Sequence, residues 1–181
     1  MLLHVWVASW EFECCQRDVI VGERWGGSLI LDPPEPWWIK YLSDALTDEV
    51  MELGVSEFDG DLERPAPAPD RVGLARAGSA RIGIVGASES GPQRFRGRLR
   101  FEGHGGGPDD DLLELLACEG AVRRVRGVPL AFELREIVDE GAGYVPIAQG
   151  APVDLNSTGD SYPSARVGYP FEDYLVDLEV D

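Results

Sequence analysis

The sequence predicts a mainly β protein, a β-rich α+β domain in which an antiparallel sheet or small barrel carries one long helix. Three observations predict it. Several short segments alternate apolar and polar residues with a period of two, which is typical of half-buried strands. Regular alternation of strands and helices is absent, which argues against a parallel α/β sheet. A length of 181 residues with 44% hydrophobic residues suits a single domain over 1–181.

The N-terminal third is expected to contain two or three strands and the helix. Residues 4–15 alternate, and residues 24–31 follow a Gly22-Glu23 turn. Pro36 suits the first turn of a helix over 36–53, and Gly54 suits its C-cap. Seven apolar residues recur at helical spacing: Trp38, Tyr41, Leu42, Ala45, Leu46, Val50 and Leu53.

The rest of the chain reads as strands and two long surface loops. A proline-rich loop is expected at about 59–71, and a Gly-, Pro- and Ser-rich one at about 139–173. A short helix is predicted over 109–118, where acidic residues favour a helix N-terminus. Further strands are predicted at 81–85, 94–101, 121–128, 130–138 and 174–180.

The strand at 94–101 has the clearest alternation. It places Arg94, Arg96, Arg98 and Arg100 on one face, and Phe95, Leu99 and Phe101 on the other. Residues 71–100 carry 7 basic side chains and 1 acidic one, in a chain with a net charge of −17. Pairing with neighbouring acidic strands is the expected role of these arginines. An anion site using Arg96, Arg98, His104 and the glycine-rich loop 103–107 is the alternative.

The charge also excludes some classes of protein. An acidic surface repels phosphates, so nucleic acid is not an expected partner. No apolar run reaches the roughly 18 to 20 residues that a membrane span needs, and no signal peptide is recognisable. Three cysteines, two of them adjacent, do not form a disulfide framework. These features predict a cytoplasmic protein without a membrane partner.

No complete catalytic constellation is found, so no catalytic residues and no cofactor are expected. The His104-Gly-Gly-Gly107 segment has the letters of an esterase oxyanion loop, but only two histidines exist and no nucleophile elbow accompanies them. Adjacent Cys14 and Cys15 point to opposite faces of a strand and cannot readily share a metal. No metal is therefore expected, with Cys14, Cys15, His104 and Asp109 as the only candidate ligands.

Several segments carry a family resemblance. Trp10-Glu-Phe-Glu-Cys-Cys15 and Val19-Ile-Val-Gly-Glu-Arg-Trp25 resemble a group of uncharacterised actinobacterial proteins that open with a W-x-x-x-C-C strand. Gly97-Arg-Leu-Arg, Gly120-Ala-Val-Arg-Arg-Val-Arg126 and Tyr174-Leu-Val-Asp-Leu178 are similar to that group in the same order. The resemblance implies no activity, substrate or cofactor.

The sequence therefore predicts a non-enzymatic binding or interaction protein. Its acidity suits a basic protein partner, with Glu11, Glu13, Asp44, Asp48 and Glu52 as candidate surface residues. The alternative is a small-ligand or metal-binding protein that uses the arginine strand and the glycine-rich loop. The sequence leaves the oligomeric state open.

Overall fold

A computed structural model describes residues 1–8, 18–32, 49–56, 72–85, 91–102, 116–137, 141–161 and 173–181. This part of the chain is almost entirely β, which confirms the mainly β prediction. It contains the strands β1 (Leu2–Ala8), β2 (Arg24–Asp32), β3 (Glu49–Ser56), β4 (Val72–Ala77), β5 (Ala80–Val85), β6 (Gly91–Glu102), β7 (Ala117–Val128), β8 (Leu130–Ile137), β9 (Gly141–Ala148), β10 (Val153–Leu155) and β11 (Asp173–Glu179), and the 3-10 helix η1 (Thr158–Ser161).

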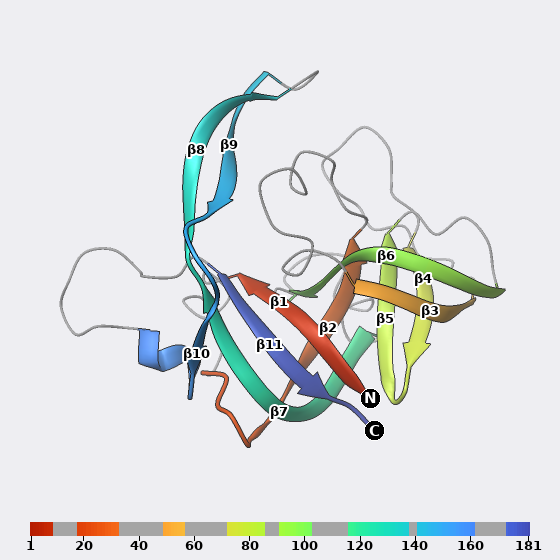
Figure 1. Ribbon diagram of the computed structural model, residues 1–181. Helices are drawn as coiled ribbons and strands as arrows, with labels where there is room; N and C mark the ends of the chain where they lie inside the picture. The colour runs from red at the N-terminus through yellow and green to blue at the C-terminus, as the bar shows by residue number, and fades with distance from the viewer. Residues whose placement is uncertain are drawn as a thin grey trace.

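Nine of the described strands form one strongly curved sheet, in the order β10-β7-β11-β1-β6-β2-β5-β4-β3. Two additional pairings, β7 with β2 and β6 with β3, close the sheet on itself and give it a barrel-like form (Figure 1). Most pairs are antiparallel, as expected, but β1 pairs in parallel with β6 and β2 with β5. The sheet is therefore mixed rather than antiparallel.

The main core lies inside this curved sheet and is built from one face of each strand. Val5 and Val7 on β1 meet Tyr174 and Val176 on β11, in register with one another. Alternate residues of β2, β5 and β6 complete the same cluster. The period-two pattern predicts the core-facing side of β6 and β11 correctly, whereas on β1 it favours the face of Trp6 over that of Val5 and Val7.

One close packing contact joins β2 to the core. The rings of Trp25 and Phe101 lie 4.8 Å apart between centroids, at an interplanar angle of 38°. Gly27 follows on β2, and a Cβ added there would lie 1.9 Å from the Phe101 ring. Only glycine leaves room for that ring, which explains a glycine within a strand.

A second, smaller cluster lies on the outer face of the sheet. Trp6, Val128 and Leu175 are buried there, with Leu130 and Ala148 packed against them. The alternation of residues 4–15 predicts a half-buried strand with Trp6 on its apolar face. In the structure both faces of β1 are covered, since Leu3, Val5 and Val7 face the main core.

The predicted helix over 36–53 is wrong in the part that the structure describes. Residues 49–53 belong to β3, which pairs with β6 on one side and with β4 on the other. Met51, Leu53 and Val55 recur with a period of two, so this stretch satisfies a strand pattern as well as a helical one. Residues 36–48 lie outside the described part of the chain.

Two other predictions, both for the second half of the chain, differ from the structure. Ala117 and Cys118, which were predicted to end a short helix, begin β7 instead, and 109–115 lie outside the described residues. Within the predicted loop at 139–173 the structure has β9, β10 and η1. The predicted loop at 59–71 also lies outside the described residues.

Candidate interaction surface

The hairpin of β8 and β9 stands apart from the large sheet. The two strands pair only with each other among the described strands, and they project from the body of the molecule (Figure 1). Pro129 connects β7 directly to β8. The backbone N–H of Gln149, just after β9, donates to the backbone carbonyl of Pro129 at 2.8 Å. The hairpin is therefore anchored at its base and extends away from it.

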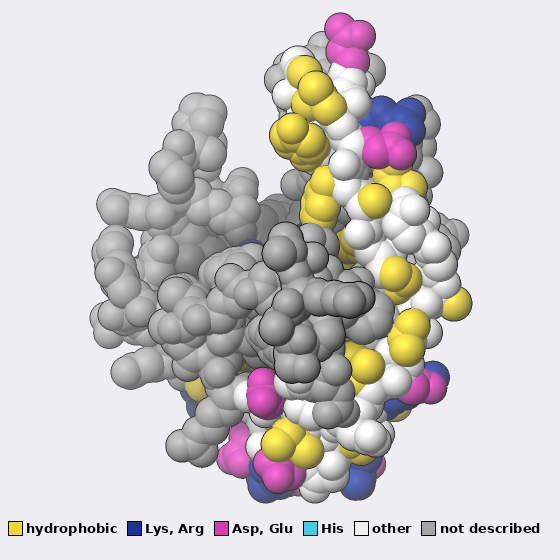
Figure 2. Space-filling model, turned by 90° about the vertical axis from the view of Figure 1, so that its left-hand side faces the viewer, with side chains coloured by type: hydrophobic (Ala, Val, Ile, Leu, Met, Phe, Trp, Pro, Cys, Tyr) yellow, Lys and Arg dark blue, Asp and Glu magenta, His cyan; other side chains and the backbone are white. Residues whose placement is uncertain are grey.

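One face of this hairpin is apolar and exposed. The antiparallel register pairs Leu134 with Tyr144, and Phe132 lies two residues before Leu134 on β8, so these three side chains share one face. Phe132 is 46% exposed, Leu134 63% and Tyr144 69%. Hydrophobic side chains gather along the projecting hairpin in the space-filling view (Figure 2). We call Phe132, Leu134 and Tyr144 the hairpin apolar face.

The hairpin apolar face continues into the body of the protein. Leu130 and Ala148 form the next cross-strand pair on that face, and both pack against Trp6, Val128 and Leu175. The base of the hairpin is thus fixed by a buried cluster, while Phe132, Leu134 and Tyr144 farther out expose apolar side chains to solvent. Such an exposed apolar arrangement is typical of a binding surface.

The opposite face of the hairpin carries an ion pair beside Ala131 and Ile147. Arg135 Nη2 donates to Glu133 Oε2 at 2.6 Å, two residues away on the same strand and the same face. Both side chains are about half exposed, so the pair is solvent-screened and adds little stability. At the start of β9, Gly141 has a φ of 84°, a left-handed conformation that favours glycine near a turn.

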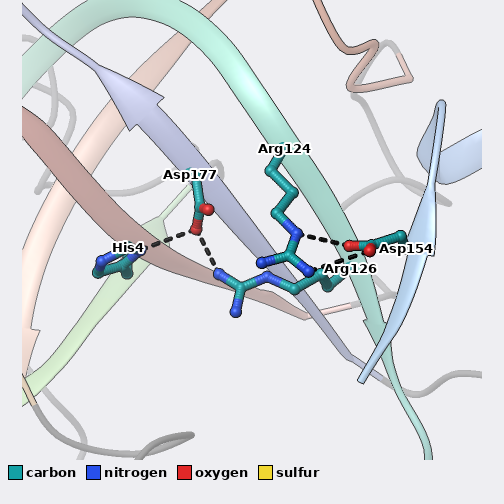
Figure 3. A network of polar contacts seen from close by, with 5 residues as sticks. All are labelled: His4, Arg124, Arg126, Asp154 and Asp177. Atoms are coloured by element: carbon teal, nitrogen blue, oxygen red, sulfur yellow. Dashed lines mark hydrogen bonds and ion pairs between the residues drawn. The ribbon is translucent and has the colours of Figure 1, made fainter. Parts of the chain in front are cut away.

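A polar network joins β1, β11 and β7 (Figure 3). His4 Nδ1 lies 2.8 Å from Asp177 Oδ1, and Arg126 Nη2 donates to the same oxygen. The Asp177 side chain is only 10% exposed and that of Arg126 only 17%. A nearly buried carboxylate is thereby matched by a cation, as burial of a charge requires.

A second ion pair extends this network toward β10. Arg124 Nε donates to Asp154 Oδ1 at 2.5 Å and Arg124 Nη2 to Asp154 Oδ2 at 3.0 Å, a bidentate arrangement. Arg124 holds the pKa of Asp154 below its ordinary value through these hydrogen bonds. A register shift at Asp177/Leu178 lets Arg124 and Arg126 share the face of Asp177 while Val122 and Val125 both reach the main core.

The residues of this network have a structural role, since their hydrogen bonds join neighbouring strands. Asp177 and Asp154 each accept hydrogen bonds from an arginine, so neither carboxylate is poised as a general base. Trp6 adds a further buried tie, since its Nε1 donates to Asp173 Oδ2 at 2.9 Å. The sequence did not predict these pairings, because they join residues that lie on different strands, from 30 to 173 positions apart.

The arginine strand is placed as its alternation predicted. Arg98 lies over Trp6, with its Cζ 5.7 Å from the ring centroid, and Arg96, Arg98 and Arg100 all take part in interactions. The register sets Glu52 opposite Arg94 and Asp32 opposite Arg98. This placement favours internal pairing of the basic strand, while the ligand site of Arg96, Arg98 and His104 stays a prediction.

The remaining candidate ligands cannot be placed. Cys14, Cys15, His104 and Asp109 lie outside the described residues, as do Glu11, Glu13, Asp44 and Asp48. Within the described ranges, no three His, Cys, Asp or Glu residues gather as a metal site would require. No helix in that part of the chain is long and apolar enough to cross a membrane.

The fold and surface thus define a mainly β protein with a closed mixed sheet and a projecting two-stranded arm. The family described as "Family of unknown function (DUF6578)" matches residues 1–180, and the chain belongs to it. No curated protein and no solved structure matches the chain. The expected membership of a family without assigned function is confirmed at this level, and no activity follows from it.

Proposed function

We propose that this protein is a binding protein that engages a basic protein partner through the hairpin apolar face. The proposal rests on the exposure of Phe132, Leu134 and Tyr144 on a hairpin whose base packs against a buried cluster of the large sheet. A rigid base with an exposed aromatic and aliphatic face supplies anchor residues without a large ordering cost.

Charge supports a basic partner. The hairpin sequence from 130 to 148 contains four acidic residues and one arginine, in a chain whose net charge is −17. An apolar acceptor surface rimmed by Lys and Arg would complement such an arm, and opposite charges would speed their encounter. A partner with an acidic rim would be repelled.

A synthetic amphipathic peptide of alternating lysine and leucine residues tests this proposal. We expect it to bind the protein in calorimetry, and to bind at least tenfold more weakly to the Phe132→Asn/Leu134→Asn variant, which loses apolar contact area. Raising NaCl from 50 to 300 mM should also weaken binding steeply, because the charge attraction is screened.

Two controls separate this result from non-specific adhesion. Val153→Asn changes an equally apolar side chain, 48% exposed on β10, and should leave binding unchanged. A glutamate–leucine peptide of the same pattern should not bind. Equal binding of the lysine peptide to the wild type and the hairpin variant, with both folded by circular dichroism, would overturn the proposal.

A further inference from the structure

The outer edge of β8 is a second feature of the hairpin, separate from its apolar face. In an antiparallel pair, residues alternate between those that bond their partner strand and those whose N–H and C=O point outward. The bond from Gln149 N–H to the Pro129 carbonyl fixes the phase of this alternation. Residues 130, 132, 134 and 136 of β8 therefore direct their backbone groups away from β9.

The two edges of the hairpin are not equivalent. On β9 the same phase points residues 142, 144, 146 and 148 outward, and position 146 is a proline. Pro146 costs the hairpin no ladder bond, since its missing N–H would face outward, but it interrupts the β9 edge. The β8 edge has no proline, and no strand pairs with it in the described part of the chain.

The sequence of β8 is self-complementary when it is paired antiparallel with itself. With Leu134 of both copies at the two-fold axis, Glu133 faces Arg135 of the second copy, and Arg135 faces Glu133 of the second copy. The outward backbone groups of Leu134 then bond each other reciprocally. A slip by two residues in either direction places Glu133 against Glu133 or Arg135 against Arg135, which like-charge repulsion disfavours.

We infer that two copies of this chain associate through their β8 edges, forming a four-stranded antiparallel sheet from two hairpins. Residues directly opposite in such a sheet share a face, so the Leu134 side chains of the two copies would meet on one side of it, with Phe132 of each copy opposite Glu136 of the other. The Glu133–Arg135 pairs, already formed within each strand at 2.6 Å, would become a cluster of four charges on the other side. This association does not rest on the proposed basic partner, because it uses the edge and not the apolar face.

The expected dimer is weak and depends on salt in a characteristic way. A short two-strand junction buries little area, so we expect dissociation constants on the order of 10 to 100 µM. Each copy carries a net charge of −17, which opposes association. Salt screens that repulsion, so the dimer should strengthen with NaCl, whereas binding of a basic partner should weaken.

Charge exchange between Glu133 and Arg135 tests the register. Sedimentation velocity at 1–200 µM should show a monomer–dimer equilibrium for the wild type. Glu133→Arg or Arg135→Glu alone sets like charges opposite each other twice and should raise the dissociation constant roughly tenfold. The double variant Glu133→Arg/Arg135→Glu restores both opposite-charge pairs and should return dimerisation to the wild-type value.

A matched control changes the same charge elsewhere. Arg24→Glu alters an exposed ion pair with Glu119, far from the hairpin in sequence, and should leave dimerisation unchanged. Leu134→Pro removes an outward N–H at the centre of the junction and should abolish the dimer. A monomer at every concentration, or a dimer that the two single charge reversals do not weaken, would overturn the inference while leaving the peptide-binding result to judge the proposed function.

Discussion

The position of Cys118 in the sheet lowers the reactivity of its thiol. Cys118 lies near the start of β7 opposite Gly27 of β2, and it packs against the main core. Burial raises the pKa of its thiol to about 11, from an ordinary value of 9.0. Because the thiolate is the reactive form, the folded protein should protect this cysteine from alkylation and oxidation at neutral pH.

We expect Cys118 to react slowly and with a displaced pH profile. In a Cys14→Ser/Cys15→Ser variant at pH 8, a pKa of about 11 leaves roughly 100-fold less thiolate than a pKa of 9.0 would. The rate of alkylation, followed by mass spectrometry, should rise about tenfold per pH unit up to pH 11. The same variant unfolded in guanidinium is the control. A rate that levels off near pH 9 in the folded protein would contradict the expected protection.

Residues near one another in sequence were predicted better than residues brought together by the fold. The alternation of Arg94 to Phe101 fixed which side chains share a face of β6, and the structure agrees. The sequence offered no signal for the contact of His4 with Asp177 or of Trp6 with Asp173, since neither register nor strand order is encoded locally.

Among the strands, β11 depends on a buried charge for its placement between β1 and β7. Asp177 is satisfied by His4 from one neighbouring strand and by Arg126 from the other. Removing the carboxylate would leave Arg126 nearly buried without this partner, and the Arg126 Nε already has no hydrogen-bond partner among the described residues. Leaving a nearly buried charge without its partner lowers the free energy of unfolding by more than the ion pair itself contributes.

Asp177→Asn should therefore lower the free energy of unfolding by about 1–3 kcal/mol. Asp154→Asn is the matched control, because its ion pair with Arg124 is exposed and its loss should be much smaller. Urea titration of both variants measures the difference. A larger effect for Asp154→Asn than for Asp177→Asn would reverse this assignment of the buried and the exposed pair.

Sequence reasoning missed two kinds of element. One is a segment that fits both a helical and a strand spacing, and the other is a strand that contains glycine or proline. Residues 49–53 match a helical spacing that includes Val50 and Leu53, yet their pairing with β6 decides in favour of a strand. β9 contains two glycines and Pro146, so it reads as a loop. Its partner β8 makes it a strand, because Pro146 stands at a position that needs no ladder bond.

At the scale of the whole molecule, the charge of −17 opposes compaction. Exposed pairs such as Arg24–Glu119 and Arg135–Glu133 bring opposite charges together, but the large acidic excess cannot be neutralised internally. Salt should thus stabilise the fold on balance, since screening the general repulsion outweighs the loss of a few solvated pairs.

We expect the midpoint of thermal unfolding to rise by several degrees when NaCl increases from 10 to 150 mM. Differential scanning calorimetry at low protein concentration, where any dimer dissociates, isolates this effect from association. Sucrose at matched osmolality serves as the control for non-ionic effects. A midpoint that falls with added salt would show that local ion pairs dominate over the net charge.

The pairing of β1 with β11 also governs when the protein can fold. Leu2 stands opposite Glu179, so β1 gains its β11 neighbour only after the intervening residues have been synthesised, whereas its other neighbour, β6, is made earlier. At typical rates of synthesis that delay is roughly 10 to 30 s, during which Leu3, Val5 and Val7 lack their β11 partners. The pairing of β1 with β11 is therefore a late step in folding, which follows the synthesis of every other described strand.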